Sequence, residues 1–198
     1  MSRLITFGCS HTRGEGVDDP STESWPAYLG ECLDMEVVNK GVDGVSNKFI
    51  QHEVVNFKFQ PDDIVAILWT YPDRTCVFKS ATECSVTIVP KSLSHRSEHY
   101  YKHYHTSYNA NFESKVIIHQ VNSFLHQKYL PVYNLPINKT LVNIFELIDF
   151  DYVNIFFSNF LNDPKYRKGH NNHAGHLANR FYAKEIYKHI YTHGQKEK

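Results

Sequence analysis

Two short stretches near opposite ends of the chain hold residue types that could perform nucleophilic catalysis. The first is Gly-Cys-Ser-His-Thr at positions 8–12, which follows directly on the apolar residues 4–7. Gly8 allows a sharp turn and the close approach of a substrate. Ser10 then stands where the N–H groups at the start of a helix could stabilise negative charge. The pattern predicts a serine nucleophile at the carboxyl end of a buried strand, with an ordinary Gly/Ser/Thr turn as the alternative.

The second stretch is Gly-His-Asn-Asn-His-Ala-Gly-His at positions 169–176, just ahead of a predicted C-terminal helix. Serine is a weak nucleophile at neutral pH and needs a base within hydrogen-bond distance. Histidine, with a pKa of about 6.5, is the usual base. A histidine in this loop could reach the sheet edge that holds Ser10, so the stretch is expected to supply the base.

Metal and nucleotide chemistry are less well supported by the same residues. His170, His173 and His176 follow at intervals of three, which on a helix spreads them too widely to converge on one ion. The glycines of segment 41–44 form neither a complete Gly-x-Gly-x-x-Gly motif nor a phosphate-binding loop with its lysine. We therefore expect no metal and no other cofactor.

Alternating strand and helix patterns indicate how these residues are positioned. Three apolar segments are each followed by a turn and a helical pattern, which predicts a right-handed parallel α/β sheet. In such sheets ligands collect outside the carboxyl ends of the strands. The expected fold is a three-layer α/β/α sandwich with a mainly parallel sheet of about five strands. The expected strands are 4–7, 35–39, 64–69 and 130–134. One expected helix begins at residue 25, and three others span 48–56, 112–128 and 172–191. Segment 141–161 could be either a helix or a strand.

The middle of the chain shows little periodicity. Segment 74–111 has few regularly spaced apolar residues and contains a patch rich in tyrosine and histidine at 99–105. Variable segments of α/β proteins commonly pass over the site edge. We expect a long loop or irregular excursion here, with 75–111 as an insertion or lid within a single domain spanning 1–198.

Composition and charge exclude several classes of partner and location. Of 198 residues, 41% are hydrophobic, and Lys plus Arg equals Asp plus Glu at 21 each. This balance favours neither nucleic acid nor an anionic membrane. The four cysteines (Cys9, Cys32, Cys76 and Cys84) form no Cys-x-x-Cys pair and are expected to be reduced. Without a signal-peptide pattern or an apolar run of about 18 residues, the expected location is the cytoplasm or, alternatively, a virion.

The chain resembles the SGNH (GDSL-like) hydrolases in several sequence blocks. The family's first block, usually Gly-Asp-Ser, matches positions 8–12 and implies Ser10 as the nucleophile. Its second block, Asn-x-Gly-x-x-Gly-x-Ser/Thr, matches positions 39–46 and implies that the Gly44 N–H is an oxyanion-hole donor. Its last block, His-Pro-Asn-x-x-Gly-His, matches positions 170–176 and implies His170 as the base.

The resemblance also has two departures. The third block, normally Gly-x-Asn-Asp, reads Trp-Thr-Tyr-Pro-Asp-Arg at 69–74, so Thr70 is the nearest hydroxyl that could replace the missing asparagine. Similar stretches occur in divergent, phage-type members. The family's aspartate, which precedes the histidine, is replaced by Arg167 and Lys168. Asp163 is the nearest carboxylate, and otherwise a backbone carbonyl would orient the histidine of a Ser–His dyad.

The resemblance implies a flavodoxin-like SGNH fold and a serine esterase, acting for example on an O-acetyl group of a carbohydrate or on another small ester. Ser10, His170 and Asp163 would form the triad, and Ser10, Gly44 and Thr70 would bind the oxyanion. The alternative is a catalytically silent binding or structural module, for instance of a viral particle, which the two departures favour. Segment 99–105 would then serve as a contact or carbohydrate-stacking surface.

Overall fold

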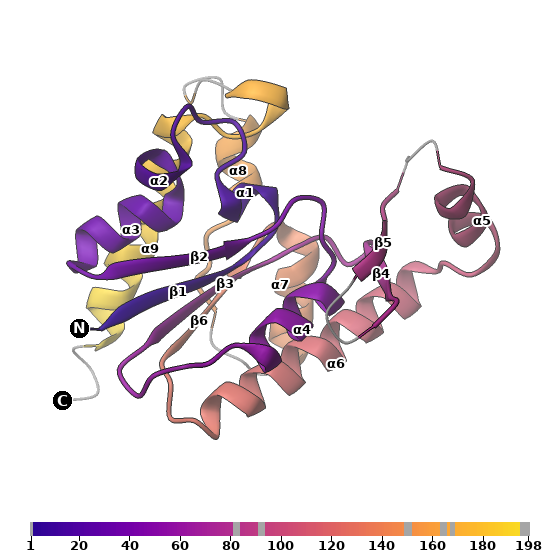
Figure 1. The fold of residues 1–198 in the computed structure, drawn as a ribbon, viewed down its shortest axis with the longest axis horizontal. Helices are drawn as coiled ribbons and strands as arrows, with labels where there is room; N and C mark the ends of the chain where they lie inside the picture. Colours follow the sequence, from indigo (N-terminus) through magenta and orange to yellow (C-terminus); the bar gives the residue numbers. More distant parts are fainter. Residues whose placement is uncertain are drawn as a thin grey trace.

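The computed structural model describes residues 2–80, 84–90, 94–148, 152–162, 166 and 169–194. Within this part of the chain, four parallel strands form one central sheet in the order β2-β1-β3-β6 (Figure 1). The strands are β1 (Arg3–Gly8), β2 (Glu36–Gly41), β3 (Ile64–Trp69) and β6 (Val132–Pro136). The expected parallel α/β fold is confirmed, with four strands in place of about five.

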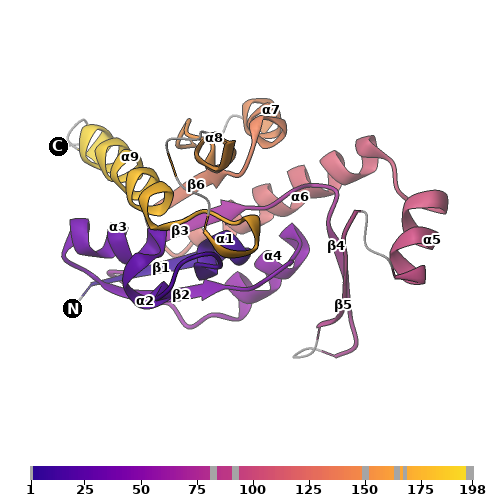
Figure 2. The same ribbon diagram turned by 90° about the horizontal axis from the view of Figure 1, so that it is seen from above.

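Continuous apolar sequence explains the two central strands. β1 pairs with β2 on one side and β3 on the other, and β3 pairs in turn with β6. Residues Val65 to Trp69 are fully buried, as expected for a strand covered on both faces. Helices flank the sheet (Figure 2): α3 (Trp25–Leu33) packs against α9 (His176–Gly194), and α4 (Asn47–Asn56) packs against α6 (Ser107–His126).

Capping side chains set where the helices near the site begin. The Ser24 hydroxyl accepts a hydrogen bond from the Ala27 N–H at the start of α3, and the Ser46 hydroxyl accepts one from the Phe49 N–H at the start of α4. The remaining helices are α1 (Ser10–Arg13), α2 (Pro20–Glu23), α5 (His95–His103), α7 (Lys139–Ile148), α8 (Phe157–Asn162) and the 3₁₀ turn η1 (His170–Asn172). The ambiguous segment 141–161 is therefore helical in most of its described part.

The C-terminal helix begins later than predicted. The expected helix over 172–191 starts at His176, because the residues before it form the turn η1. Asn171 in that turn has a φ of 54°, a left-handed conformation that interrupts a helix and that asparagine tolerates better than most residues. This turn determines which histidine reaches the site.

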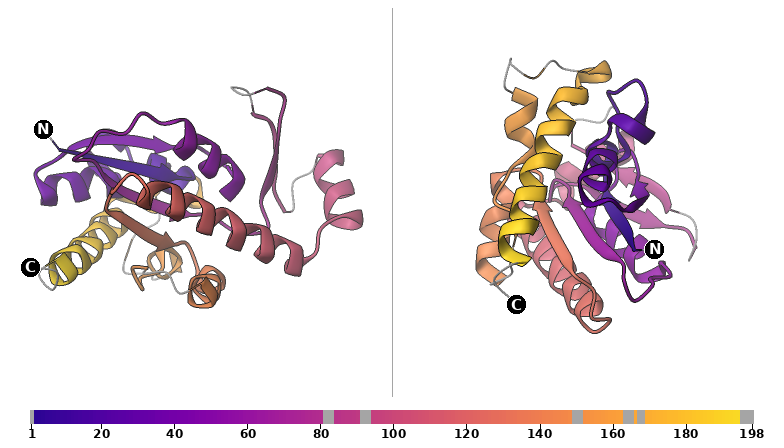
Figure 3. Two further views of the ribbon diagram at one scale, coloured as in Figure 1. Left: turned by 90° about the horizontal axis from the view of Figure 1, so that it is seen from below. Right: turned by 90° about the vertical axis from the view of Figure 1, so that its left-hand side faces the viewer.

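Segment 75–111 is not the irregular excursion we expected. It contains an antiparallel hairpin of β4 (Thr75–Phe78) and β5 (Cys84–Ile88), followed by α5 and the first turn of α6. The hairpin and α5, together called the arm, project from the body of the sheet (Figure 1; Figure 3). Strands of four and five residues are too short to leave a clear periodic pattern, which explains why the sequence did not predict them.

No helix in the described part of the chain is both long and apolar enough to cross a bilayer.

Candidate active site

The turn after β1 presents Ser10. β1 ends at Gly8, and the carbonyl of Cys9 accepts hydrogen bonds from the N–H groups of Thr12 and Arg13 in the short helix α1. A Cβ on residue 8 would lie 2.1 Å from the Thr12 hydroxyl, so this close approach requires glycine. Ser10 is the first residue of α1 and is only 7% exposed. The serine therefore stands at the carboxyl end of a buried strand, as the sequence predicted.

His173 is the histidine that contacts this serine. Ser10 Oγ and His173 Nε2 are 3.0 Å apart, and His173 Nδ1 lies 3.0 Å from the carbonyl oxygen of Asn171. A carbonyl only accepts hydrogen bonds, so Nδ1 carries the proton and Nε2 accepts from the serine hydroxyl. This is the arrangement that a general base needs.

The predicted pairing of Ser10 with His170 is wrong. His170 lies at the surface, where its side chain is 72% exposed and its Nε2 lies 3.0 Å from Asp18 Oδ1. The physical reason is the turn η1, in which the left-handed Asn171 carries the His170 ring outward and brings His173 over Ser10. The available signal was the second histidine of the same stretch, but the spacing of the SGNH pattern favoured His170 over His173.

A backbone carbonyl holds the His173 ring, which was the alternative to an aspartate. Asp163 lies outside the described residues. Glu15, which no sequence motif indicated, accepts a hydrogen bond from Asn171 Nδ2 at 3.0 Å and so fastens the turn that supplies the carbonyl. That bond, together with the nearby charges of Arg13 and the two histidines, lowers the pKa of the Glu15 carboxyl. Glu15 is thus ionised near neutral pH and adds negative charge near His173.

The ring of His11 packs next to the ring of His173. Its buried ring lies 4.9 Å from the ring of His173 and 4.7 Å from that of Phe157, measured between centroids. Burial, followed by the positive charges of His173 and Arg74, lowers the pKa of His11 to about 3. His11 is therefore neutral near pH 7 and supports His173 without competing for its proton.

The end of β2 brings Gly44 to the same site. Asn39 joins this strand to the serine turn, because its Nδ2 donates to the Thr12 carbonyl at 2.8 Å and its Oδ1 accepts from the Gly41 N–H at 2.9 Å. Gly44 has a φ of 66°, a left-handed conformation that favours glycine, and it lines a pocket together with Ser10. The donation from its N–H to an oxyanion remains a prediction.

Thr70 lies behind the site rather than in it. Its side chain is fully buried, and its hydroxyl accepts a hydrogen bond from Arg74 Nη1 at 3.0 Å. Asn47 holds the backbone of the same residue, accepting from the Thr70 N–H at 2.9 Å and donating to its carbonyl at 3.1 Å. Arg74 lines the pocket and Thr70 does not. The structure therefore directs the Thr70 hydroxyl toward Arg74 and not toward the predicted oxyanion.

The pocket around Ser10 and His173 has a volume of about 790 Å³, within the range typical of small-molecule sites. Val89 and Pro90, which follow β5, contribute to it, so segment 75–111 supplies part of one wall. The described residues contain no group of three or more histidine, cysteine or acidic side chains that could hold a metal ion. The lining residues are Ser10, Glu15, Asp43, Gly44, Tyr71, Asp73, Arg74, Val89, Pro90, Asn171 and His173.

Replacing Asn47 with alanine is expected to destabilise the fold and disturb the turn after β3. The substitution leaves the buried N–H and carbonyl of Thr70 without their side-chain partner, which should cost about 2–3 kcal/mol of unfolding free energy. Urea denaturation measures this loss. The matched control is Asn56→Ala, at the exposed end of the same helix, which should change stability by less than about 0.5 kcal/mol. Equal stability of the two variants would contradict the assignment.

Comparison with known proteins identifies the fold. No protein-family model and no curated protein matches the chain. Solved structures do match: TesA has a TM-score of 0.64 at 11% identity, covering 95% of this chain and 97% of that chain. The acetyl xylan esterase AlAXEase has a TM-score of 0.59 at 14% identity, with 95% and 99% covered. A protein described as belonging to the G-D-S-L lipolytic family, from Desulfitobacterium hafniense, has a TM-score of 0.57 at 13% identity, with 94% and 98% covered. The expected SGNH-type fold is confirmed.

Proposed function

We propose that this chain is a divergent SGNH-type serine esterase that cleaves small esters, such as an O-acetyl group on a carbohydrate. The observation that carries the proposal is the 3.0 Å contact between Ser10 Oγ and His173 Nε2, inside a pocket at the carboxyl ends of a parallel sheet. The fold shared with esterases, among them an acetyl xylan esterase, supports the same reaction class.

In this mechanism Ser10 Oγ attacks the ester carbonyl carbon while His173 Nε2 takes the hydroxyl proton. The N–H groups of Ser10 and Gly44 donate to the oxygen that becomes negative. The Asn171 carbonyl holds the ring, and Glu15 holds the Asn171 side chain and so fastens the turn that supplies this carbonyl. His173 then gives the proton to the leaving alcohol, and water releases the acyl group by the same steps.

The pocket's charges favour a neutral alcohol. Three carboxylate residues line it, Glu15, Asp43 and Asp73, against a single arginine. An anionic leaving group would face this excess of negative charge, whereas a sugar hydroxyl would find hydrogen-bond acceptors. Tyr71 adds an aromatic, half-buried ring to the wall, a surface on which sugars commonly stack.

The test is hydrolysis of p-nitrophenyl acetate, together with covalent labelling by a fluorophosphonate, in wild type and Ser10→Ala. We expect turnover and labelling in wild type and neither in the variant, with circular dichroism confirming that both are folded. A folded wild type that neither hydrolyses the ester nor becomes labelled would overturn the proposal and favour a catalytically silent binding module.

A further inference from the structure

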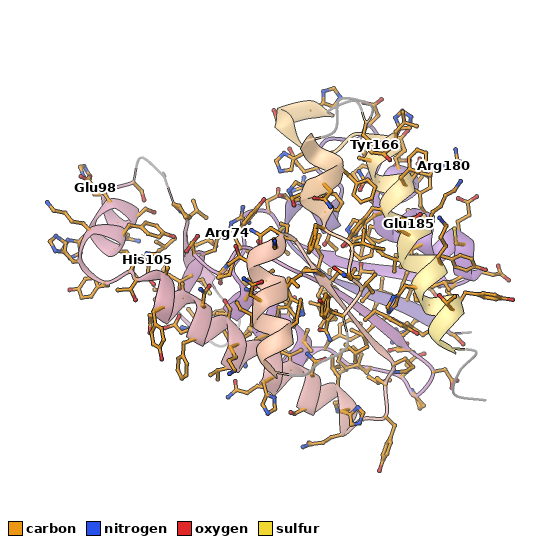
Figure 4. All side chains as sticks on the ribbon, turned by 180° about the vertical axis from the view of Figure 1, so that it is seen from behind. Arg74, Glu98, His105, Tyr166, Arg180 and Glu185 are labelled. Atoms are coloured by element: carbon orange, nitrogen blue, oxygen red, sulfur yellow. The ribbon has the colours of Figure 1, made fainter. Side chains whose placement is uncertain are left out.

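Arg74 is held at the edge of the pocket by residues of its own turn. Its Nη1 donates to the Thr70 hydroxyl at 3.0 Å, and its guanidinium carbon lies 5.0 Å from the centre of the Tyr71 ring. Asn47 fixes the backbone of Thr70 in turn. Figure 4 shows Arg74 between the arm side, where His105 lies, and the body of the sheet. These two contacts hold the guanidinium group in one position at the pocket.

This arginine has no carboxylate partner among the residues that the structure describes. The nearby acids are engaged elsewhere: Arg13 pairs with both Asp43 and Glu15, and Asp73 Oδ1 lies 3.1 Å from His105 Nε2. A guanidinium has five N–H donors, and the Thr70 hydroxyl is the one described acceptor for this one. A half-buried positive charge without a counter-charge raises the free energy of the folded protein. A negative charge that forms during the reaction would lower that free energy, so the position suits a transient anion.

We propose that Arg74 is the third oxyanion donor, in place of the asparagine that the SGNH pattern carries after this strand. The inference rests on the esterase proposed above. As Ser10 Oγ bonds to the carbonyl carbon, the π pair of the carbonyl moves to oxygen, and a guanidinium N–H donates to that oxygen. When the pair returns, the bond to the alcohol breaks and the alcohol takes its proton from His173. Arg74 donates a hydrogen bond and keeps its own proton throughout, because a guanidinium is not deprotonated in proteins.

The charges of the pocket distinguish this role from recognition of an anionic substrate. Arg13 and His105 offset part of the negative charge of the pocket's acids. The lining still holds three acids, Glu15, Asp43 and Asp73, against one arginine, which disfavours a substrate carboxylate or phosphate. An oxyanion forms only in the transition state, next to Ser10, and is stabilised there by a fixed positive charge. The proposal therefore predicts an effect on kcat with a neutral ester, and little effect on KM.

The experiment compares Arg74→Ala, Arg74→Gln and Arg74→Lys with wild type on p-nitrophenyl acetate. We expect kcat of Arg74→Ala to fall by about 10²–10³-fold, with KM changed less than about threefold. Arg74→Lys keeps the charge without the planar fork and should lose less. Added guanidinium at low millimolar concentration should restore part of the Arg74→Ala activity. The matched control is Arg180→Ala on the exposed side of α9, which should behave as wild type.

A boronic acid inhibitor separates catalysis from structural support. Its tetrahedral adduct on Ser10 carries the negative charge of the oxyanion, so its inhibition constant should rise in parallel with the fall in kcat. Wild-type kcat in folded Arg74→Ala and Arg74→Gln would overturn the Arg74 proposal alone, as would a loss confined to KM or to negatively charged esters. A folded wild type without turnover and without labelling of Ser10 would overturn the esterase proposal and the role of Arg74 with it.

Discussion

His173→Ala is expected to reduce ester hydrolysis to the level of Ser10→Ala, about 10⁴-fold or more below wild type. Without the imidazole, the serine hydroxyl loses the acceptor that lies 3.0 Å away. Removing either member of such a pair removes the same step, so the double variant should be no worse than each single one. His170→Ala should keep activity within about threefold, because His170 is exposed and paired with Asp18 on the surface.

The measurement is kcat and KM for p-nitrophenyl acetate in wild type, the three single variants and the double variant, with thermal melting to show that each is folded. His170→Ala serves as the matched control, since it removes a histidine three residues away in the same turn. A loss in His170→Ala as large as that in His173→Ala would contradict the assignment of the base.

Which histidine contacts Ser10 depends on the backbone of one residue. The sequence predicted a serine and a histidine from two stretches that the structure brings into contact, because strand-end turns and loops ahead of a terminal helix meet at one edge of a parallel sheet. The spacing of the SGNH pattern favoured His170. The left-handed conformation of Asn171 reverses this choice, and propensity alone does not predict a single left-handed asparagine.

The central strands could be predicted because they are buried on both faces, whereas β4 of the arm is not. Buried parallel strands need apolar residues on both faces, so 64–69 is legible as an uninterrupted run. β4 is short and partly exposed, with Val77 open to solvent, and therefore has no comparable pattern. The ambiguity of 141–161 has a similar origin, because α7 buries several apolar residues between its neighbours and departs from simple alternation.

Thr70 and Arg74 show the limit of choosing site residues by proximity in sequence. Both follow β3, and Thr70 is the nearer to the strand end. Asn47 bonds to the backbone N–H and carbonyl of Thr70, and the Thr70 hydroxyl accepts from the Arg74 guanidinium. That contact spans distant parts of the chain, so only the folded structure shows it.

Acidification should destabilise this protein through His11. Its folded-state pKa is lowered to about 3, mainly by burial, whereas the ordinary value for an unfolded histidine is about 6.5. Between these values the unfolded chain binds a proton that the native state excludes, so stability rises with pH and is lost as the pH falls below about 6.5. The slope from this one group is about 1.4 kcal/mol per pH unit, reaching about 3 kcal/mol near pH 4.

His11→Phe isolates that contribution, because phenylalanine keeps a flat ring against His173 and Phe157 but does not titrate. Urea denaturation at several values between pH 7 and pH 4 should give a shallower fall in the variant, by about 1 kcal/mol or more per pH unit. The control is His126→Gln, an exposed histidine at the end of α6, whose slope should stay close to that of wild type. Identical slopes in wild type and His11→Phe would show that His11 accepts its proton in the native state. In that case the native protein would carry a positive charge on the His11 ring, next to His173, below neutral pH. Acid would then add a charge beside the proposed base without lowering stability through His11.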